Sequence, residues 1–227
     1  MATHGKRYRA AVAKVEPRAY DLDEALALLR SLDGAKFDET VEVAMNLNVD
    51  TRQSDQQVRG SISLPKGTGK TVRVIVFAEG DLAEEAKAAG ADAVGSEDLV
   101  KKITDGWLEF DVAIAVPAMM RHVGKLGRLL GPKGLMPSPK AGTVTDKVTD
   151  AVKEYKAGRV EYRCDNGGNV HVAVGKASFS NEDLEENINA FLDHVRRNKP
   201  TGVKGQFIKK AVVGLTMSPG VSLAGVA

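Results

Sequence analysis

Two glycine-rich segments could bind phosphate groups, which is the first chemistry that this sequence suggests. Gly67–Thr71, GTGKT, resembles the end of a phosphate-binding P-loop, in which glycines let backbone amides approach phosphates. The full motif needs a glycine where Leu64 stands and a strand before it, whereas the apolar run Val72–Phe77 follows it. The glycines of Gly124–Gly134 lack both the G-x-G-x-x-G spacing of a dinucleotide site and its acidic partner. A nucleotide-binding enzyme is therefore an alternative that the motifs disfavour.

Metal and nucleophile chemistry also lack a suitable group of residues. The four histidines are scattered, and the single cysteine, Cys164, cannot support a zinc site. No serine or cysteine lies in a nucleophile-elbow motif. His171 falls on the polar side of an expected strand, where a surface or RNA contact is a better interpretation than catalysis. The absence of these motifs favours a binding protein over an enzyme.

The segment Gly124–Thr143, GKLGRLLGPKGLMPSPKAGT, is basic and contains no acid. No Asp or Glu occurs between Asp111 and Asp146. Glycine and proline recur through the segment and exclude one continuous helix, and a long basic loop is usually functional. The acid-free ends of the chain, 1–15 and 194–227, are also basic, although the net charge is only +2. Such local positive fields suit phosphate-bearing partners.

The overall composition is that of an ordinary globular protein. Of its 227 residues, 43% are hydrophobic and 27% are charged, which argues against disorder and suits one large domain or two small ones. A lone cysteine excludes an internal disulfide and indicates a reducing, intracellular location. The N-terminus lacks the apolar core of a secretory signal, and no apolar run is long enough to span a bilayer. We therefore expect a soluble cytoplasmic protein without membrane contact.

At the two ends of the chain, apolar and polar residues alternate with a period of two. This pattern is typical of antiparallel strands with one buried face, expected at 40–49, 58–64, 160–164, 170–174 and 207–215. Asp165–Asn169, DNGGN, is typical of a hairpin turn. Helices are expected over 21–32, with Asp21 and Glu24 capping its first turn, and after the N-cap Ser180. The ends therefore predict an α+β fold.

The middle of the chain has a different pattern. Continuous apolar strands at 72–77, 91–94 and 112–116 alternate with helices at 81–89, 97–104 and 145–157. Thr145 is the expected N-cap of the last helix, and Gly158 its end. This alternation predicts a parallel sheet covered on both faces, and hence a Rossmann-like α/β domain. We predict that this domain, 67–158, is inserted into a split α+β domain, 1–66 and 159–227, through two joints that act as a hinge.

Two short segments remain open to alternative interpretations. In Lys36–Glu42, KFDETVE, Phe37 stands at the start of the first strand, and the residues alone favour a core-edge position over exposure. Thr216–Gly220, TMSPG, is interpreted as an ordinary strand exit. From the residues alone, the chain is a two-domain protein that binds an anion. Because only 5% of residues are aromatic, structured RNA recognised through its backbone fits better than base stacking, and a nonspecific nucleic-acid coat protein is an alternative.

Motifs along the whole chain resemble one known family. GKLGRLLGPKGLMPSPKAGTV resembles the signature of the ribosomal protein L-one family in its bacterial form. Further segments resemble the family in the same order, namely KFDETVEVAMNL, SDQQVRGSISLPKGTGK, AGADAVG, DGWLEFDVAIAVP, KAGRVEYR, GKASF and LTMSPG. The resemblance covers essentially the whole chain and implies the same split fold, no enzyme activity and no cofactor.

The resemblance implies a structural protein of the large ribosomal subunit, located on the cytoplasmic ribosome. Members bind 23S rRNA at the mobile stalk near the exit site and assist the release of deacylated tRNA. In bacteria they also repress translation of their own operon by binding a similar structure in its mRNA. The implied partners are therefore the 23S rRNA stalk helices, exit-site tRNA, this mRNA and other large-subunit components. Off the ribosome we expect a monomer.

The resemblance places the RNA site on the split domain and not on the basic segment. The implied contacts flank the first and last strands: Lys36, Phe37, Thr40, Glu42, Thr216, Met217 and Ser218. Secondary contacts are expected from Arg52, Arg59, Arg163, His171 and Lys176. This reverses the interpretation of Phe37, and a carboxylate such as that of Glu42 can accept a hydrogen bond from a ribose 2′-hydroxyl. Ser218 and Gly220 depart from the family's frequent Thr-Met-Gly-Pro-Ser, so Ser218 adds a side chain beside the expected RNA.

Overall fold

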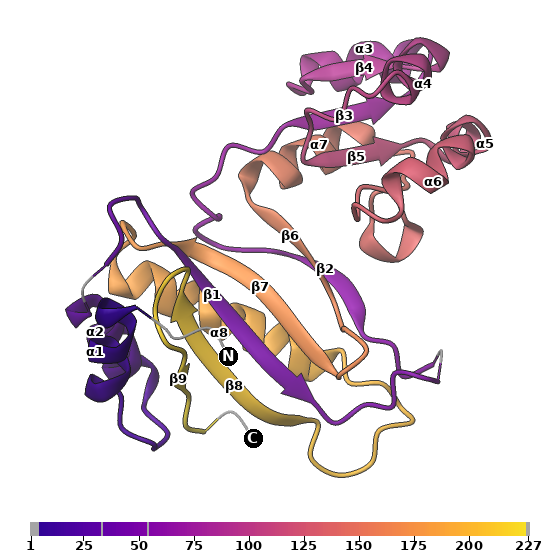
Figure 1. Cartoon of the computed structure of the whole chain (residues 1–227). Helices are drawn as coiled ribbons and strands as arrows, with labels where there is room; N and C mark the ends of the chain where they lie inside the picture. The colour runs from indigo at the N-terminus through magenta and orange to yellow at the C-terminus, as the bar shows by residue number, and fades with distance from the viewer. Residues whose placement is uncertain (1–4, 33, 54, 226–227) are drawn as a thin grey trace. The chain divides into compact units, whose positions relative to one another are not determined.

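The computed structural model describes residues 5–32, 34–53 and 55–225, and the chain forms two compact units. One unit combines the chain up to Gly69 with the chain from Val160 onward, and we call it the split unit. The other, Lys70–Arg159, is the inserted unit. The sequence predicted joints at 66/67 and 158/159, within a few residues of these bounds. Figure 1 labels the elements of each unit.

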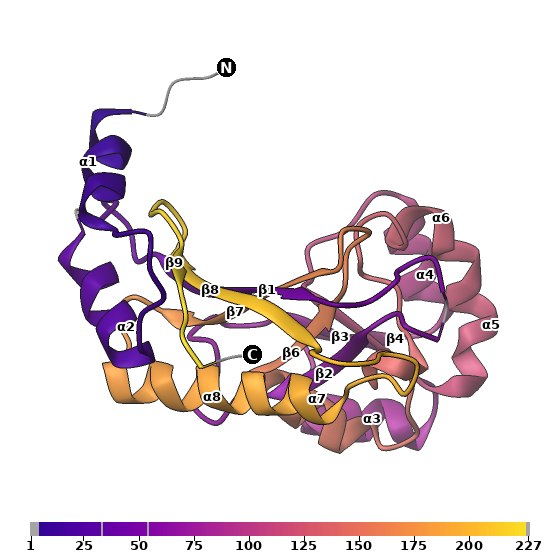
Figure 2. The same ribbon diagram turned by 90° about the horizontal axis from the view of Figure 1, so that it is seen from below.

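The split unit is built on a four-stranded sheet with the order β7-β1-β8-β9. Each neighbouring pair is antiparallel, and the strands are β1 (Thr40–Leu47), β7 (Asn169–Lys176), β8 (Ile208–Leu215) and β9 (Val221–Ser222). Helices α2 (Leu22–Ser31) and α8 (Asn181–Arg197) cover one face of this sheet (Figure 2). The predicted α+β architecture with an antiparallel sheet is confirmed.

Alternating apolar residues explain how the sheet packs. Four residues of β1 are each at most 1% exposed, namely Val41, Val43, Met45 and Leu47. Helix α8 buries a matching stripe of Leu184, Ile188, Phe191, Leu192 and Val195. Ser180 caps α8 as predicted, because its Oγ accepts a hydrogen bond from the Asp183 N–H at 3.1 Å. Sequence periodicity thus leaves the opposite face of β1 open to solvent.

A two-stranded sheet and a hairpin complete the split unit. Strand β2 (Arg59–Ser63) pairs with β6 (Arg159–Arg163). The predicted turn follows β6: the Asp165 carboxylate accepts hydrogen bonds from the N–H groups of Gly167 and Asn169 at 2.8 and 2.7 Å. The first helix, α1 (Lys6–Lys14), was not predicted, because it buries only Ala11 and has no clear apolar stripe.

The inserted unit contains the predicted parallel sheet, with the strand order β4-β3-β5. Its strands are β3 (Val74–Phe77), β4 (Ala93–Gly95) and β5 (Val112–Ala115). Its longer helices are α3 (Asp81–Ala88), α4 (Glu97–Thr104) and α7 (Val148–Ala157). All four residues of β3 are buried, as expected for a central strand covered on both faces. The Rossmann-like α/β prediction is confirmed.

The basic segment of the inserted unit is more ordered than the predicted loop. Short helical turns follow one another: η1 (Pro117–Met119), α5 (Met120–Val123), η2 (Gly124–Leu126), α6 (Gly127–Leu130) and, after a gap, η3 (Pro139–Ala141). The prediction that it forms no single continuous α-helix is confirmed, but the loop prediction is wrong for residues 124–130 and 139–141. Glycine weakens a helix without forbidding helical dihedral angles, so buried leucines can hold the turns in place.

Two predicted helix caps are wrong. Asp21 occupies the N-cap position of α2, but its side chain makes no capping hydrogen bond, and Glu24 instead pairs with the Arg18 guanidinium. Helix α7 begins at Val148, later than predicted, and Thr145 Oγ1 accepts from the Lys147 N–H at 3.1 Å within the preceding turn. In both cases another donor binds the side-chain oxygen that was expected to cap the helix. The Arg18 guanidinium binds the Glu24 carboxylate, and the Lys147 N–H binds Thr145 Oγ1.

Candidate nucleic-acid interface

The segment before β1 and the turn after β8 meet at one end of the main sheet. Antiparallel register pairs Val41 with Leu215, which brings Thr40 beside Thr216. The Thr40 N–H donates to Thr216 Oγ1 at 3.0 Å, and the Thr216 N–H donates to the Thr40 carbonyl at 3.1 Å. Two segments that lie 176 residues apart in the sequence therefore form one continuous surface.

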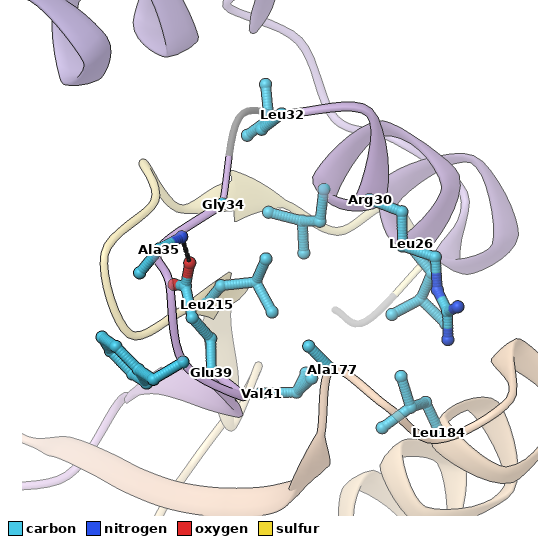
Figure 3. A pocket seen from close by; sticks show the side chains of 12 residues that line it. Leu26, Arg30, Leu32, Gly34, Ala35, Glu39, Val41, Ala177, Leu184 and Leu215 are labelled. Atoms are coloured by element: carbon cyan, nitrogen blue, oxygen red, sulfur yellow. Dashed lines mark hydrogen bonds between the residues drawn. The ribbon is translucent and has the colours of Figure 1, made fainter.

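Glu39 fixes these two segments to each other. Glu39 is only 4% exposed, and its carboxylate accepts a hydrogen bond from the Ala35 N–H at 2.5 Å (Figure 3). The same carboxylate accepts a second hydrogen bond, from the Met217 N–H at 2.8 Å. The Glu39 carbonyl also accepts from the Ala177 N–H at 2.8 Å. A buried carboxylate is stable only when such donors surround it. Glu39 thus sets the distance between the Lys36–Phe37 segment and the Met217 turn.

Sequence analysis did not select Glu39, although one signal could have found it. The period of two along β1 places position 39 on the same side as Val41 and Val43, which is the buried side. An acidic residue on the buried side of an otherwise apolar strand needs hydrogen-bond donors around its carboxylate. Such donors are commonly supplied by loops that a site must hold together.

Phe37 and Met217 are large apolar side chains exposed on this surface. Their exposed fractions are 55% and 52%, and they are two of the four large hydrophobic residues exposed within the described residues. The core-edge position that the residues alone favoured for Phe37 is therefore wrong, because the ring lies largely in solvent. Exposed apolar side chains that rim a polar surface are typical of binding sites. Lys36, beside Phe37, is also exposed.

An apolar cavity of about 360 Å³ lies behind the Phe37 segment. Figure 3 shows its walls, which come from α2, β1, α8 and the end of β8. Its lining includes Leu26, Leu29, Leu32, Leu184 and Leu215. Because the cavity separates the segment from a close-packed core, the hydrogen bonds of Glu39 contribute much of what holds Ala35 and its neighbours in place.

The open face of the sheet continues from this surface. Lys176 Nζ donates to Thr40 Oγ1 at 2.8 Å. Glu42 is exposed and is paired with Ala173 on one side and Gly214 on the other, so no large side chain on these partners covers its carboxylate. His171 is exposed on the same face, opposite Ala44. We call Lys36, Phe37, Thr40, Glu42, Lys176, Thr216 and Met217 together the β1–β8 surface.

Ser218 and Gly220 have local roles in the turn after β8. Ser218 is half-buried, and its Oγ accepts from the Leu215 N–H at 2.9 Å, so the hydroxyl turns back onto its own strand. A Cβ at Gly220 would lie 2.5 Å from Val212 Cγ1, which is closer than side-chain atoms approach. The sequence departures at these two positions are therefore accommodated by the turn itself.

Three predicted secondary contacts lie at the other end of β1. Arg52, Arg59 and Arg163 are exposed near the hairpin, where the Leu47 N–H donates to the Gly168 carbonyl. The length of β1 separates them from the β1–β8 surface by roughly 20–25 Å at the usual rise per strand residue. The structure therefore does not bring all the predicted contacts together. We call Arg52, Arg59 and Arg163 the hairpin basic group.

Ionisable residues beside the hairpin have clear structural explanations. The backbone N–H of Asn169, together with its side chain, holds the pKa of Asp165 below its usual value. Burial, with the nearby charge of Asp165, raises the pKa of the Cys164 thiol, so this cysteine stays protonated and unreactive. Neither residue is arranged as a nucleophile or an acid–base pair.

The P-loop-like segment has no arrangement for holding a nucleotide. Lys70, its lysine, forms an ion pair with Asp111 at 2.7 Å, and this contact lowers the pKa of that carboxyl. Gly67 and Gly69 have φ values of 67° and 70° and serve as turn residues before β3. Across the part of the chain that the structure describes, no three His, Cys, Asp or Glu side chains converge as a metal site requires. No helix in this part is long and apolar enough to cross a membrane.

Comparison with known proteins identifies the class to which this fold and surface belong. The sequence model of the Ribosomal protein L1p/L10e family matches residues 29–219. The chain belongs to this family, and it is therefore a structural ribosomal protein and not an enzyme. The resemblance inferred from the motifs is confirmed, and the expected location on the cytoplasmic ribosome follows from the membership.

Bacterial relatives match the chain over nearly its whole length. The large ribosomal subunit protein uL1 of Thermosipho africanus is 57% identical over 225 residues, covering 98% of this chain and 97% of that protein. The protein of the same description from Lactobacillus johnsonii is 54% identical over 224 residues, with the same coverage. The similarity therefore extends over both the split unit and the inserted unit.

Proposed function

We propose that the chain is a constituent of the large ribosomal subunit that binds 23S rRNA at the mobile stalk through the β1–β8 surface. The observation that carries this proposal is the buried Glu39 carboxylate, which joins the Phe37 and Met217 segments at 2.5 and 2.8 Å. A surface held in one shape by buried hydrogen bonds suits a partner of defined shape. Folded RNA helices, read by shape and 2′-hydroxyl contacts, are such a partner.

Each exposed residue of the surface has a suitable role toward RNA. Phe37 and Met217 can pack on ribose rings and base faces, since both carry exposed apolar side chains. Lys36 can contact phosphates, and Glu42 can accept a hydrogen bond from a 2′-hydroxyl. Thr40 and Thr216 already bond to each other, so they shape the surface more than they extend from it. Ser218 acts in the same indirect way through Leu215.

The hairpin basic group and His171 would extend the interface along the open face of the sheet. Arg52, Arg59 and Arg163 are exposed cations at the far end of β1. Contacts there add phosphate attraction without sequence information, because cations bind any RNA backbone. A long stalk helix could contact both ends of the strand. We assign these residues to secondary contacts within the split unit, with the inserted unit outside this interface.

The proposed stalk position carries two further functions. Beside the exit site the protein would contact deacylated tRNA and assist its release. Off the ribosome, as a monomer, it would repress translation by binding the mRNA of its own operon where that mRNA forms a structure similar to the stalk. One surface serves both RNAs, because shape recognition extends to any RNA that presents the same arrangement of helices.

The first experiment measures binding to a stalk-helix fragment of 23S rRNA and to an unrelated hairpin of equal length, each at two salt concentrations. Preference for the stalk fragment with a shallow salt dependence would support the proposal. Equal binding to both RNAs that falls steeply with salt would mean that only phosphates are recognised, and it would overturn the assignment of the β1–β8 surface.

A further inference from the structure

The basic segment of the inserted unit is not used by the proposed stalk interface, yet its helical turns bury one side and expose the other. Backbone angles at Met119, Gly124 and Gly127 are right-handed helical, so α5, η2 and α6 form one run of turns. Buried side chains at most 1% exposed anchor the run in the core, namely Val123, Leu126 and Leu130. Exposed residues recur on the other side at spacings of three and four, namely Arg121, Gly124, Lys125 and Arg128.

The cations on this exposed side have no carboxylate partners. No ion pair in the described ranges of the chain includes Arg121, Lys125 or Arg128. The acid at its edge, Glu97, pairs with His122 at 3.4 Å. Three exposed cations on a fixed base create a local positive field in a chain of nearly balanced charge.

Two glycines on the same run are not required by the fold. Gly124 and Gly127 both have φ of −55°, with ψ of −31° and −33°, which any residue adopts. Nothing lies within 4 Å of the position that a Cβ would occupy at either glycine. Alanine would stabilise helical turns better at both positions, so neither backbone strain nor packing explains the glycines. A missing side chain does let another molecule approach the backbone closely.

We propose that Arg121, Gly124, Lys125, Gly127 and Arg128, which we call the basic face, form a second RNA site that binds phosphate backbone. The cations neutralise phosphates, and the bare glycines let the RNA backbone approach the surface of the turns. Segment 121–142 contains no Phe, Tyr or Trp, so the site lacks the large aromatic rings of a base-stacking platform and we expect a contact that tolerates any sequence. This site lies on the inserted unit and is independent of the stalk-binding proposal.

An RNA partner fits this face better than an acidic protein does. The centres of protein interfaces rely on aromatic and apolar anchors, and the one large hydrophobic residue exposed on the described part of the basic segment is Leu129. A ribosomal protein is surrounded by RNA phosphates, which need only cations and close approach.

The test compares two triple variants of the full chain that remove the same charge. The test variant is Arg121→Gln, Lys125→Gln and Arg128→Gln; the matched control is Lys87→Gln, Lys147→Gln and Lys153→Gln, at exposed lysines of the same unit. Binding to an unrelated RNA duplex is measured across a salt series. The test variant should lose about tenfold in affinity at low salt, and its salt slope should fall by about 2 to 3, while the control changes little.

Each other outcome overturns the assignment in a different way. Equal losses in both triples would mean that net charge alone attracts RNA. Tighter binding of polyglutamate than of duplex RNA, lost in the test variant, would assign the face to an acidic protein. A stalk fragment measured alongside should bind both triples as it binds the unchanged chain. If the unchanged chain fails to bind the stalk fragment, the stalk proposal fails, whereas the duplex comparison still decides the basic face.

The glycines provide an independent test with a folding readout. Gly124→Ala with Gly127→Ala should leave the melting temperature unchanged or raise it, while duplex affinity falls several-fold. A lower melting temperature would mean that the glycines serve folding, and unchanged affinity would mean that RNA does not approach them. Either result would remove close backbone approach from the proposal.

Discussion

The β1–β8 surface and the basic face differ in the kind of residue that they expose. The first presents Phe37 and Met217 near an exposed carboxylate, Glu42, and a buried carboxylate fixes its shape. The second presents cations and bare glycines without an acid among them. If the β1–β8 surface binds the stalk as we propose, its affinity depends on fit, because phosphate attraction alone does not favour a surface that keeps an acid. Under the two proposals, the basic face attracts RNA through charge, whereas the β1–β8 surface recognises its shape.

The largest effect expected from a single substitution is that of Met217→Asp on stalk-RNA affinity. A carboxylate at this exposed position removes an apolar contact and faces phosphates, and like-charge contacts of this kind cost enough to weaken binding about 100-fold. Folding should be nearly unaffected, because the side chain is 52% exposed. Binding to the stalk fragment is measured by anisotropy, with the melting temperature as the control for folding.

A substitution in the basic segment, outside the basic face, completes this comparison. Lys133→Ala removes a charge from the basic segment and should change stalk-fragment affinity by less than about threefold, since it loses at most one phosphate contact. Equal losses for Met217→Asp and Lys133→Ala would place the stalk site elsewhere. Thr216→Ala should also lower the stalk-fragment affinity, as Met217→Asp does. The substitution removes the hydroxyl that accepts a hydrogen bond from the Thr40 N–H.

The second prediction concerns the residue that fixes the shape of the β1–β8 surface. In Glu39→Gln the amide oxygen can accept from one N–H, but the amide NH2 then faces the other donor. An unsatisfied buried group of this kind lowers the free energy of unfolding by about 1–3 kcal/mol. Stalk affinity should fall about tenfold, because the Phe37 segment loses its fixed position. Glu42→Gln, on the exposed side of the same strand, is the matched control and should leave stability unchanged.

The binding readout separates positioning from simple destabilisation. A large-to-small substitution in the buried stripe of α8 should lower stability only. Such a variant should bind the stalk fragment normally below its melting temperature. If Glu39→Gln also binds normally there, Glu39 holds the fold and not the site. Duplex binding at the basic face should be unchanged by Glu39→Gln in either case.

Periodicity carried most of the fold prediction. The alternation of Val41, Val43 and Met45 and the stripe on α8 each fix which side is buried, so strand and helix types followed from spacing. The continuous apolar run of β3 likewise indicated a parallel sheet. Helix α1 and the turns of the basic segment were not predicted, because the few residues they bury give a weak pattern, and propensity alone argued for a loop through the glycines.

The candidate site was harder to predict because it depends on contacts between distant segments. No local pattern places Thr216 beside Thr40, since that contact depends on the register of β8 against β1. The exposure of Phe37 was predicted wrongly from the residues alone, because an aromatic ring at a strand start usually packs on the core. The family resemblance instead implied an RNA contact at Phe37, which stays a prediction. The position of Glu39 on the buried side of β1 was the one local signal that remained unused.

The third prediction compares one glycine from each region. In Gly220→Ala the new methyl group meets Val212 Cγ1 at 2.5 Å, and overpacking of this kind costs about 1–3 kcal/mol. Gly124→Ala on the basic face meets nothing within 4 Å and should not destabilise the chain. Urea unfolding measures both variants. Equal stability of the two would mean that the turn after β8 rearranges freely, and the shape-based account of the β1–β8 surface would then be wrong.

The smallest expected effect is that of Asp165→Ala, which lies beside Arg59 and Arg163 of the hairpin basic group, the part of the split unit whose chemistry is closest to that of the basic face. Hydrogen bonds from Asn169 lower the pKa of Asp165 in the folded chain, so its contribution to stability is present above the unfolded value of about 3.9 and is lost as the pH falls through the folded value. Asp165→Ala should therefore lower the melting temperature slightly at pH 7, by at most about 2 °C, and this gap should narrow below about pH 4. A difference in melting temperature that widens in acid would contradict the assigned hydrogen bonds.

The stalk affinity of Asp165→Ala at pH 7 should stay within about twofold of that of the unchanged chain, since Arg163 and its neighbours only add phosphate attraction. A larger loss would make the hairpin part of the shape-specific interface. It would also remove the contrast with the β1–β8 surface.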